Sequence, residues 1–298
     1  AKIWGQRLSD GTYATVYNPA EFRWPLAIST SIDGIEYTTL NLVHGEITPM
    51  RYGGNYKSYG PQYVRGIQEG NGNPPDGDLW VTYSVNKEDM WISRIPVPVK
   101  QQATAHANDR LNTKKELSEL TEWNIYSPLW APVSLESKGG NVWLKLEDQD
   151  PFDYAKIERK IPQTRELSVS FEMMAEQATY GTLQIEFLDE NGIACSRLEL
   201  TPEGVFRAKG GARFSNMMQY ESGKVYSVTA ELSASNNEIT IYVDGKRASV
   251  RRFFAPVHSI ERVVFRTGEL RQYPTPETPA DNFSDLPKAG EKEQLATF

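Results

Sequence analysis

Short runs of alternating apolar and polar residues, each closed by turn-forming residues, recur along the chain and constrain its fold more than any other feature. Leu26 to Ser31 and Leu79 to Val85 are two such runs, and Ser9-Asp10-Gly11 and Asp244-Gly245 are two of the turns. Alternation places every second side chain on one face of an extended strand, and tight turns join such strands into antiparallel sheets. The sequence therefore predicts an all-β protein.

The first 98 residues are predicted to form two small antiparallel sheets. Four strands are expected within residues 1–43 and three more within residues 63–96. Four antiparallel strands joined by turns make one blade of a β-propeller, and a propeller needs at least four blades. We therefore expect residues 1–98 to be a partial β-propeller made of its last blades. The remaining blades would come from a preceding segment or another chain, so that this chain is part of a larger assembly.

Residues 99–122 are predicted to be a linker, and residues 123–298 a second domain. Pro96, Pro98 and Gln101-Gln102-Ala103 favour an extended connection, with one short helical turn inside residues 114–120. After Trp123, strand-like runs return at spacings of roughly 8–15 residues, which is typical of an antiparallel β-sandwich.

One turn in the first region carries a recognisable motif. Ser31-Ile32-Asp33-Gly34-Ile35-Glu36-Tyr37 resembles the Asp box of sialidases and other BNR-repeat propellers, in which the carboxylate accepts hydrogen bonds from the amides of its own turn. Residues 60–70 and 79–92 resemble the last blade of the same carbohydrate-active enzymes. The resemblance implies a glycoside hydrolase acting on acidic or complex polysaccharide, and it implies that Asp33 is part of the scaffold.

The second region resembles a different group of folds. Val225 to Leu232, followed by Glu238 to Val243 and the Asp244-Gly245 turn, is similar to strand pairs of laminin-G and concanavalin-like jelly-roll sandwiches. The resemblance implies a carbohydrate-binding or packing module beside a catalytic domain. It does not identify a ligand.

Candidate site residues follow from the propeller resemblance, which implies that the innermost strand of a blade lines the substrate channel. Hydrolysis needs an acid/base carboxyl group and a nucleophile, and sialidases employ a tyrosine as nucleophile. Elimination instead needs a base such as histidine or tyrosine. The catalytic candidates are Glu46, His44, Tyr63 and Glu69.

Cations that hold sugar carboxylates, together with amide and phenol groups, complete the predicted site. The substrate-binding candidates are Arg51, Tyr52, Lys57, Gln62, Arg65, Asn86 and Lys87. Structural alternatives stay open for several of them: a capping histidine at His44, an ion-pair partner at Arg65 and a solvated hairpin turn at Asn86 and Lys87. Arg94-Ile95-Pro96 matches a sialidase signature, but it follows the last predicted blade and is interpreted as a coincidence.

Three functions remain open at this stage: a sialidase-like glycoside hydrolase, a polysaccharide lyase on the same scaffold, or a non-catalytic glycan-binding module. Asp148, Asp150 and Asp153 suit calcium, with an ordinary acidic loop as the alternative, and no other cofactor is expected. Trp123, Trp130 and Trp143 are interpreted as packing residues in preference to a sugar platform.

Composition excludes several classes of partner, and the resemblance indicates a cellular location. A net charge of −7 without a basic run gives no surface for nucleic acid. The sequence contains no run of about 18 apolar residues, which a membrane-spanning helix would need. The single cysteine, Cys195, rules out a disulfide within the chain and is expected to be buried and unreactive. The resemblance to polysaccharide-degrading enzymes favours a secreted or bacterial periplasmic protein.

Overall fold

The computed structural model describes residues 2–20, 23–46, 48, 58–67, 76–150, 153–268 and 296–297. These residues fall into two compact units, one within residues 1–101 and the other within residues 102–269 and 292–298. Each unit is described by itself.

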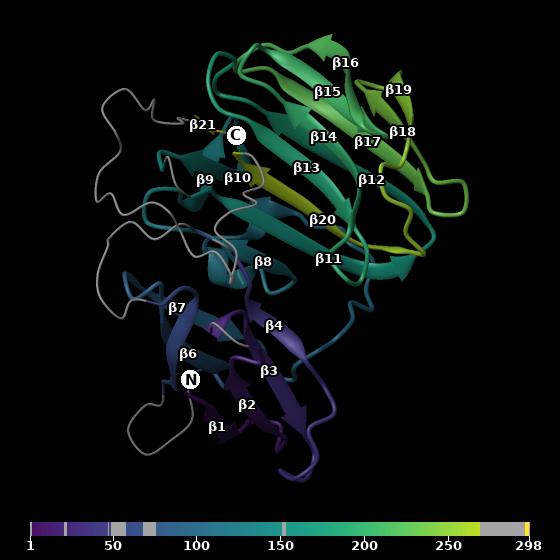
Figure 1. Ribbon diagram of the computed structural model, residues 1–298. Coiled ribbons are helices and arrows are strands. Elements are labelled where there is room, and N and C mark those ends of the chain that lie inside the picture. The colour runs from purple at the N-terminus through teal and green to yellow at the C-terminus, as the bar shows by residue number, and fades with distance from the viewer. Residues whose placement is uncertain are drawn as a thin grey trace. The chain divides into compact units, whose positions relative to one another are not determined.

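The first unit holds two antiparallel sheets whose strands follow one another in chain order (Figure 1). The four-stranded sheet contains β1 (Trp4–Arg7), β2 (Tyr13–Tyr17), β3 (Leu26–Ser31) and β4 (Asn41–His44). The three-stranded sheet contains β5 (Pro61–Gly66), β6 (Leu79–Val85) and β7 (Asp89–Ile95). Both strand counts agree with the sequence prediction.

Apolar residues of both sheets share one core in the first unit. On β6 every second side chain is buried, from Leu79 through Val81 and Tyr83 to Val85. These side chains pack in one cluster with β2 and β3 residues that include Val16 and Leu26. The alternation seen in the sequence is thus the alternation between core and exterior.

Strand β4 is shorter than the predicted run over residues 36–43. The Thr39 hydroxyl accepts a hydrogen bond of 2.8 Å from the backbone N–H of Thr30, and the same hydroxyl lies 2.8 Å from the hydroxyl of Thr30. A side chain therefore satisfies a β3 donor at this point, and the regular ladder between β3 and β4 starts only at Asn41.

The turn after β3 forms the hydrogen bonds expected of it. The carboxylate of Asp33 accepts bonds from the N–H groups of Ile35 (2.8 Å) and Glu36 (2.9 Å) and from the hydroxyl of Ser31 (2.9 Å). Gly34 has a φ of 79°, which an L side chain rarely adopts. The turn is therefore held by Asp33 itself.

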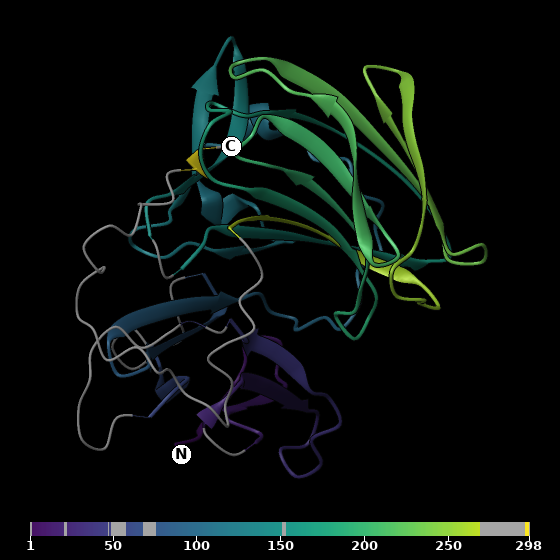
Figure 2. The same ribbon diagram turned by 45° about the horizontal axis from the view of Figure 1, so that its top comes forward.

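The second unit is an antiparallel β-sandwich with an additional small sheet (Figures 1 and 2). The seven-stranded sheet contains, in spatial order, β16 (Arg213–Gln219), β15 (Val205–Gly210), β14 (Ala194–Leu200), β13 (Leu183–Leu188), β20 (Ile260–Thr267), β11 (Lys156–Thr164) and β8 (Trp123–Tyr126). The four-stranded sheet contains β12 (Glu166–Met174), β17 (Val225–Ser233), β18 (Glu238–Val243) and β19 (Lys246–Arg252). The small sheet contains β21 (Ala296–Thr297), β10 (Asn141–Asp148) and β9 (Val133–Lys138).

The two larger sheets of this unit face each other across a single apolar core. Ile185 and Leu198 of the seven-stranded sheet and Val228 and Ile241 of the four-stranded sheet are fully buried in the same cluster. Burial of this kind is the main favourable term in folding. Among the described residues, no sheet closes into a barrel, and the all-β class is as predicted.

The predicted linker contains two turns of 3-10 helix, η2 (Leu111–Thr113) and η3 (Leu117–Glu119), the second inside the stretch where a helical turn was expected. In the part of the chain that the structure describes, no helix is long and apolar enough to cross a membrane.

Candidate functional site

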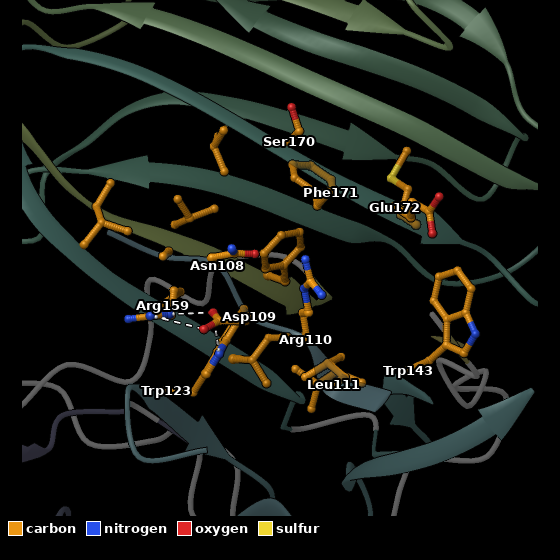
Figure 3. Close-up of a pocket in the computed structure, with 18 of the residues that line it drawn as sticks. Asn108, Asp109, Arg110, Leu111, Trp123, Trp143, Arg159, Ser170, Phe171 and Glu172 are labelled. Atoms are coloured by element: carbon orange, nitrogen blue, oxygen red, sulfur yellow. Dashed lines mark hydrogen bonds and ion pairs between the residues drawn. The ribbon is translucent and has the colours of Figure 1, made fainter. Parts of the chain in front are cut away.

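An open cavity of about 1120 Å³ lies within the second unit and is the principal candidate for a binding site (Figure 3). Its walls come from residues 106–113, from β10 and β11, and from β12, the edge strand of the four-stranded sheet. We call this cavity the inter-sheet groove. Its volume is that of a site for a ligand of several rings.

Asp109 ties one wall of the groove to the sandwich. Its carboxylate accepts hydrogen bonds from Arg159 Nε (2.7 Å), Arg159 Nη2 (3.2 Å) and the indole N–H of Trp123 (3.0 Å). Figure 3 shows these contacts as dashed lines. The Arg159 side chain is only 7% exposed. Because a buried guanidinium is costly without a partner, the carboxylate from the preceding segment stabilises it where it stands.

Asn112 fixes the same wall at a second point. Its side-chain oxygen accepts a hydrogen bond of 2.7 Å from the backbone N–H of Val142, and its amide nitrogen donates one of 3.2 Å to Asn141. Residues 106–113 are therefore held against β10 and β11 by side chains, although they belong to neither sheet.

Another part of the rim carries an indole among paired charges. Trp143 is half-buried and donates a hydrogen bond of 3.3 Å to the carbonyl of Lys138. Lys138 pairs with Glu176 at 2.6 Å, and Lys145 pairs with Glu136 at 3.1 Å. The side-chain hydrogen bond to Glu136, more than any other contact, raises the pKa of Lys145, which also lies 3.3 Å from Glu147 and 3.8 Å from Glu176. Two lysines are thus shared among three carboxylates at this rim.

The arrangement is suited to binding a ligand with both polar and apolar parts. The groove combines an aromatic wall, exposed polar groups such as Asn108 and Arg110, and an apolar interior. Among the described residues, no group of three or more histidine, cysteine, aspartate or glutamate side chains is placed to hold a metal ion.

In the first unit, the structure gathers a smaller cluster around Tyr63. Three cations lie near its ring: Arg23 at 5.4 Å, and Lys2 and Lys87 at 5.9 Å each. Arg23 Nη1 also donates hydrogen bonds to the Tyr63 hydroxyl (3.2 Å) and to Gln62 (2.7 Å). The sequence analysis named Gln62, Tyr63 and Lys87 but missed Arg23 and Lys2.

The hydrogen bond from Arg23, more than any other contact, lowers the pKa of Tyr63, and the charge of Lys87 acts in the same direction. Tyr63 has a φ of 58°, a conformation that bulky residues rarely adopt, and its side chain is 44% exposed. An exposed phenol is thus presented in a strained backbone conformation among cations. Such strain is often found at functional positions.

His44 and Glu46 occupy different surroundings. His44 is 5% exposed, its Nδ1 lies 3.1 Å from the Tyr83 hydroxyl, and the rings of Tyr83 and Trp91 each lie 5.4 Å away. Burial, assisted by the Glu46 carboxylate, raises the pKa of Tyr83 to about 12. His44 therefore lies within the packing of this unit and not on its surface.

The remaining predicted site residues of this unit divide into buried and exposed ones. Gln62 is 1% exposed and donates to the carbonyls of Ser58, Tyr59 and Gly60. Asn86 is 2% exposed and accepts a hydrogen bond of 2.8 Å from the Gly60 N–H. Arg65, in contrast, is exposed.

Four predicted site residues, Arg51, Tyr52, Lys57 and Glu69, lie outside the described residues. The three aspartates considered for calcium are buried. Asp148 accepts a hydrogen bond from Thr267 (2.8 Å), and Asp153 accepts one from Tyr126 (3.0 Å). Asp150 donates its N–H to Asp148 at 2.9 Å.

The sequence analysis did not find the inter-sheet groove. Trp123 and Trp143 were interpreted as packing residues, and both line it, whereas Trp130 is 55% exposed and lies outside its lining. No local signal marks the groove, because its walls come from four separate segments, residues 106–113, β10, β11 and β12, that converge only in the folded unit. The only local indication of the groove was the pair of polar side chains at Asn108 and Asp109 in the predicted linker.

The fold and the groove together define a β-sandwich module with a ligand site between its two sheets. The chain belongs to the family described as "Sialidase-like, CBM domain", where CBM denotes a carbohydrate-binding module; the family model matches residues 123–282. It is thus a carbohydrate-active protein.

Solved structures resemble the chain to different degrees. A structure titled "Sialidase" is 71% identical, with a TM-score of 0.94, over 100% of this chain and 27% of that one, so the chain spans about a quarter of that protein. A Crh5 transglycosylase is 11% identical with a TM-score of 0.40, covering 50% of this chain and 63% of that one. A glycoside hydrolase family 16 endo-glucanase from Bacteroides ovatus is 12% identical with a TM-score of 0.37, covering 49% and 80% of the two chains. A search of curated proteins found no match.

Proposed function

We propose that the second unit binds a glycan in the inter-sheet groove and serves a sialidase-like glycoside hydrolase. The observation that carries this proposal is an open cavity of about 1120 Å³ with the indole of Trp143 on its rim, in a unit that matches a carbohydrate-binding family. Support for the hydrolase comes from the similar sialidase, of which this chain covers 27%.

Sugar rings suit such a rim because they present C–H groups on their faces and hydroxyl groups on their edges. The C–H face packs against an aromatic ring, while hydroxyl groups bond to nearby polar side chains. Asn108, Arg110 and Glu172 are exposed and line the same cavity as Trp143. They supply both donors and acceptors.

Substitution of Trp143 tests the proposal. Wild-type chain is screened against a microarray of plant, microbial and host glycans, and affinities for the bound glycans are measured by titration calorimetry. We expect Trp143→Ala to weaken binding at least tenfold, which is about 1.4 kcal/mol, and Trp143→Phe to restore part of it. Trp130→Ala is the matched control, because Trp130 is exposed outside the groove. Unchanged affinity in Trp143→Ala contradicts the proposal.

A second function is favoured by the cluster around Tyr63. We propose that the first unit forms the last blades of a propeller and contributes Tyr63 to a hydrolytic site completed by other segments. The two sheets with strands in chain order and the three cations beside an exposed phenol support this. A phenol with a lowered pKa is a better nucleophile than an ordinary one, and the cations suit an acidic sugar. Arg65 is proposed as a further contact.

Activity of a full-length protein containing this chain tests the second proposal. Tyr63→Phe is expected to abolish release of an aryl leaving group from acidic aryl glycosides, and Lys87→Ala to raise KM. Arg94→Ala is not a suitable control, because Arg94 is paired with Asp78. Lys246→Ala is a suitable control, because Lys246 is exposed at the start of β19 in the second unit. If Tyr63→Phe keeps full activity, the phenol has no catalytic role. Products with the ultraviolet absorbance of an unsaturated uronate would favour a lyase instead.

Two further expectations, export and calcium binding, are also proposals. Export to the periplasm or the cell exterior suits an enzyme whose substrate is a polysaccharide. Calcium at Asp148, Asp150 and Asp153 is testable by a shift of the melting temperature on adding the metal or a chelator.

A further inference from the structure

The interior of the groove is apolar because one edge of the sandwich is left open. On β17 the side chains that face the other sheet are fully buried: Tyr226 is 3% exposed, and Val228 and Ala230 are 0% exposed. On the neighbouring strand β12, Val169 and Phe171 are paired with Ala230 and Val228, and these two side chains, together with Leu167, pack against the same core but are only partly buried. All three line the groove, so its floor is core surface that the described residues leave uncovered.

The part of the floor formed by β20 and β10 is also apolar. Phe265 of β20 meets Phe171 edge to face, with ring centroids 5.0 Å apart, and Leu144 of β10 is partly buried beside them. Figure 3 shows Phe171 directed into the pocket. The floor therefore joins aromatic and aliphatic side chains from both larger sheets and the small sheet.

The charge that reaches this interior is balanced. Arg159 pairs with Asp109 through two hydrogen bonds and donates a third, of 2.7 Å, to the carbonyl of Lys160. Because the Asp109 carboxylate neutralises this guanidinium, a neutral group fits the floor better than an ionised one.

An unsubstituted sugar would form favourable contacts with the rim of the groove but not with its floor. Its hydroxyl groups would lose water against Leu167, Val169 and Phe171 without gaining hydrogen bonds, which is unfavourable. An apolar substituent on the sugar would cover the floor and release water from it. The polar rim and the apolar floor are thus complementary to a ligand with one polar and one apolar part.

We propose that the inter-sheet groove binds glycans that carry a neutral O-acyl substituent. The sugar lies at the rim beside Trp143, and the acyl chain covers Leu167, Val169, Phe171 and Phe265. This inference rests on the proposed glycan-binding function and adds the chemical class of its ligand. The volume of about 1120 Å³ accommodates a sugar together with such a chain.

Titration calorimetry of the full chain with three probes tests the proposal: glucose, 6-O-acetylglucose and 6-O-octanoylglucose, the last below its micellar concentration. We expect 6-O-octanoylglucose to bind at least tenfold more tightly than glucose. Val169→Thr, which keeps the shape of the side chain and adds a hydroxyl, should reduce that advantage at least threefold. Val250→Thr is the matched control, because Val250 is 38% exposed on β19 outside the groove.

A wild-type measurement covers the case in which Val169→Thr fails to fold. An octanoyl sugar with a diazirine at the end of the acyl chain is photolysed on the wild-type chain, and we expect labelling within residues 167–171 or at Phe265. Labelling elsewhere, equal affinity for the three probes, or an octanoyl advantage unchanged in Val169→Thr overturns the acyl proposal.

Failure of the two proposals is distinguishable. If glycans bind and depend on Trp143 but show no acyl preference, the glycan-binding function stands and the acyl inference fails. If the octanoyl advantage depends on Val169 while no glycan depends on Trp143, the groove binds acyl chains and the proposed glycan site at its rim is wrong.

Discussion

Arg266 shows at the scale of single residues how this sandwich accommodates a charge in its interior. Its side chain is 2% exposed and lies 3.6 Å from Glu186, donates to Gln184, and sits 5.4 Å from the Tyr154 ring. The carboxylate of Glu186 also accepts a hydrogen bond of 2.7 Å from Arg197. The buried cation is therefore part of a network in which each charge has an opposite neighbour.

Arg266→Leu removes the hydrogen-bond donor of the buried Gln184 side chain, whereas Glu186 keeps its hydrogen bond from Arg197. We expect this change to lower the free energy of unfolding of the second unit by about 1–3 kcal/mol, the cost of leaving a buried acceptor without its partner. Urea unfolding followed by tryptophan fluorescence measures the change. Arg213→Leu, at an exposed position on edge strand β16, is the control and should change little. A loss in Arg266→Leu no larger than in the control would show that the network contributes nothing.

Asp33 gives a prediction about pH. Hydrogen bonds from the backbone of Glu36 and Ile35 and from Ser31 lower the pKa of its carboxyl group from 3.8 to about 2. A depressed pKa means that the carboxylate stabilises the folded turn above pH 4 and that this contribution is lost as the pH falls towards 2. An NMR titration of the side-chain carboxyl carbons should give a midpoint near 2 for the resonance that Asp33→Asn removes. A midpoint near 4 would mean that the turn hydrogen bonds do not persist in solution.

These residues differ in how far the sequence predicts their contacts. The partners of Asp33 lie within three residues of it, so the motif alone predicted them. Tyr63 is held by Arg23, forty residues earlier in the chain, and Arg159 by Asp109, fifty residues away. Such contacts depend on how strands are paired across sheets, which residue patterns near either partner do not specify.

At the scale of elements, the hairpin between β18 and β19 contains a glycine, Gly245, whose only evident role is its backbone conformation. Asp244 and Gly245 have φ values of 49° and 74°, as a type I′ turn requires at both central positions. No heavy atom lies within 4 Å of a Cβ placed on Gly245. A side chain here therefore meets no steric obstacle, and only backbone strain opposes it.

We expect Gly245→Ala to destabilise the second unit by about 1 kcal/mol. Gly245→Asn should cost less, because asparagine tolerates this conformation better than alanine. Thermal and urea unfolding of both variants measure the difference. Equal stability of wild type and Gly245→Ala would indicate that the turn relaxes to another type.

The segment of residues 106–113 is an element without regular structure whose role depends on side chains. Asp109→Asn removes the charge that compensates Arg159, and hydrogen bonds to a charged group contribute about 1.5–3 kcal/mol. We expect a stability loss in that range, faster hydrogen exchange over residues 106–113, and weaker glycan binding. Glu122→Gln is the matched control: Glu122 lies 3.8 Å from the same arginine but is 52% exposed, so its change should be small. Equal effects of the two variants would contradict the assigned role.

Some elements were readable in the sequence and others were not. β3 and β6 have the predicted bounds, because their alternation coincides with burial on one face. β8, β9, β16 and β19 were not predicted. The ladder of β16 has a register shift, and β19 is an edge strand in which Lys246, Arg247, Arg251 and Arg252 hide the apolar alternation. Edge strands of natural sheets often carry such charges.

At the scale of the whole molecule, the single thiol reports on the opening of the second unit. Cys195 is 0% exposed, and burial raises its pKa to about 12. Relative to the ordinary value of 9.0, the thiolate population at pH 8 is lower by on the order of a thousandfold.

We therefore expect a disulfide reagent to modify native chain very slowly and unfolded chain rapidly, with a midpoint in urea that matches the unfolding of the second unit. Glu221→Cys in a Cys195→Ser background is the control, since the Glu221 side chain is 72% exposed and its thiol should react in the native state. Rapid reaction of native wild-type chain would mean that the core around β14 opens easily.

The organisation of the whole chain was only partly predictable. The all-β class and the return of strands after Trp123 followed from local patterns. The groove did not, because it requires residues 106–113, β10, β11 and β12 to converge in space. An apolar side chain such as Val169 looks the same in a sequence whether its strand is covered or borders an opening.

The position of residues 106–113 bears on how this module is transferred between proteins. The family match begins at residue 123, whereas one wall of the groove, with Asp109 and Asn112, lies before it. A fusion protein or domain graft designed on the family boundary would carry the sandwich with one side of its groove missing. Grafts that begin at residue 102 would carry both walls of the groove. Comparing how grafts of the two lengths retain a fused protein on an immobilised glycan selected in the screen would show how much of that retention residues 102–122 determine.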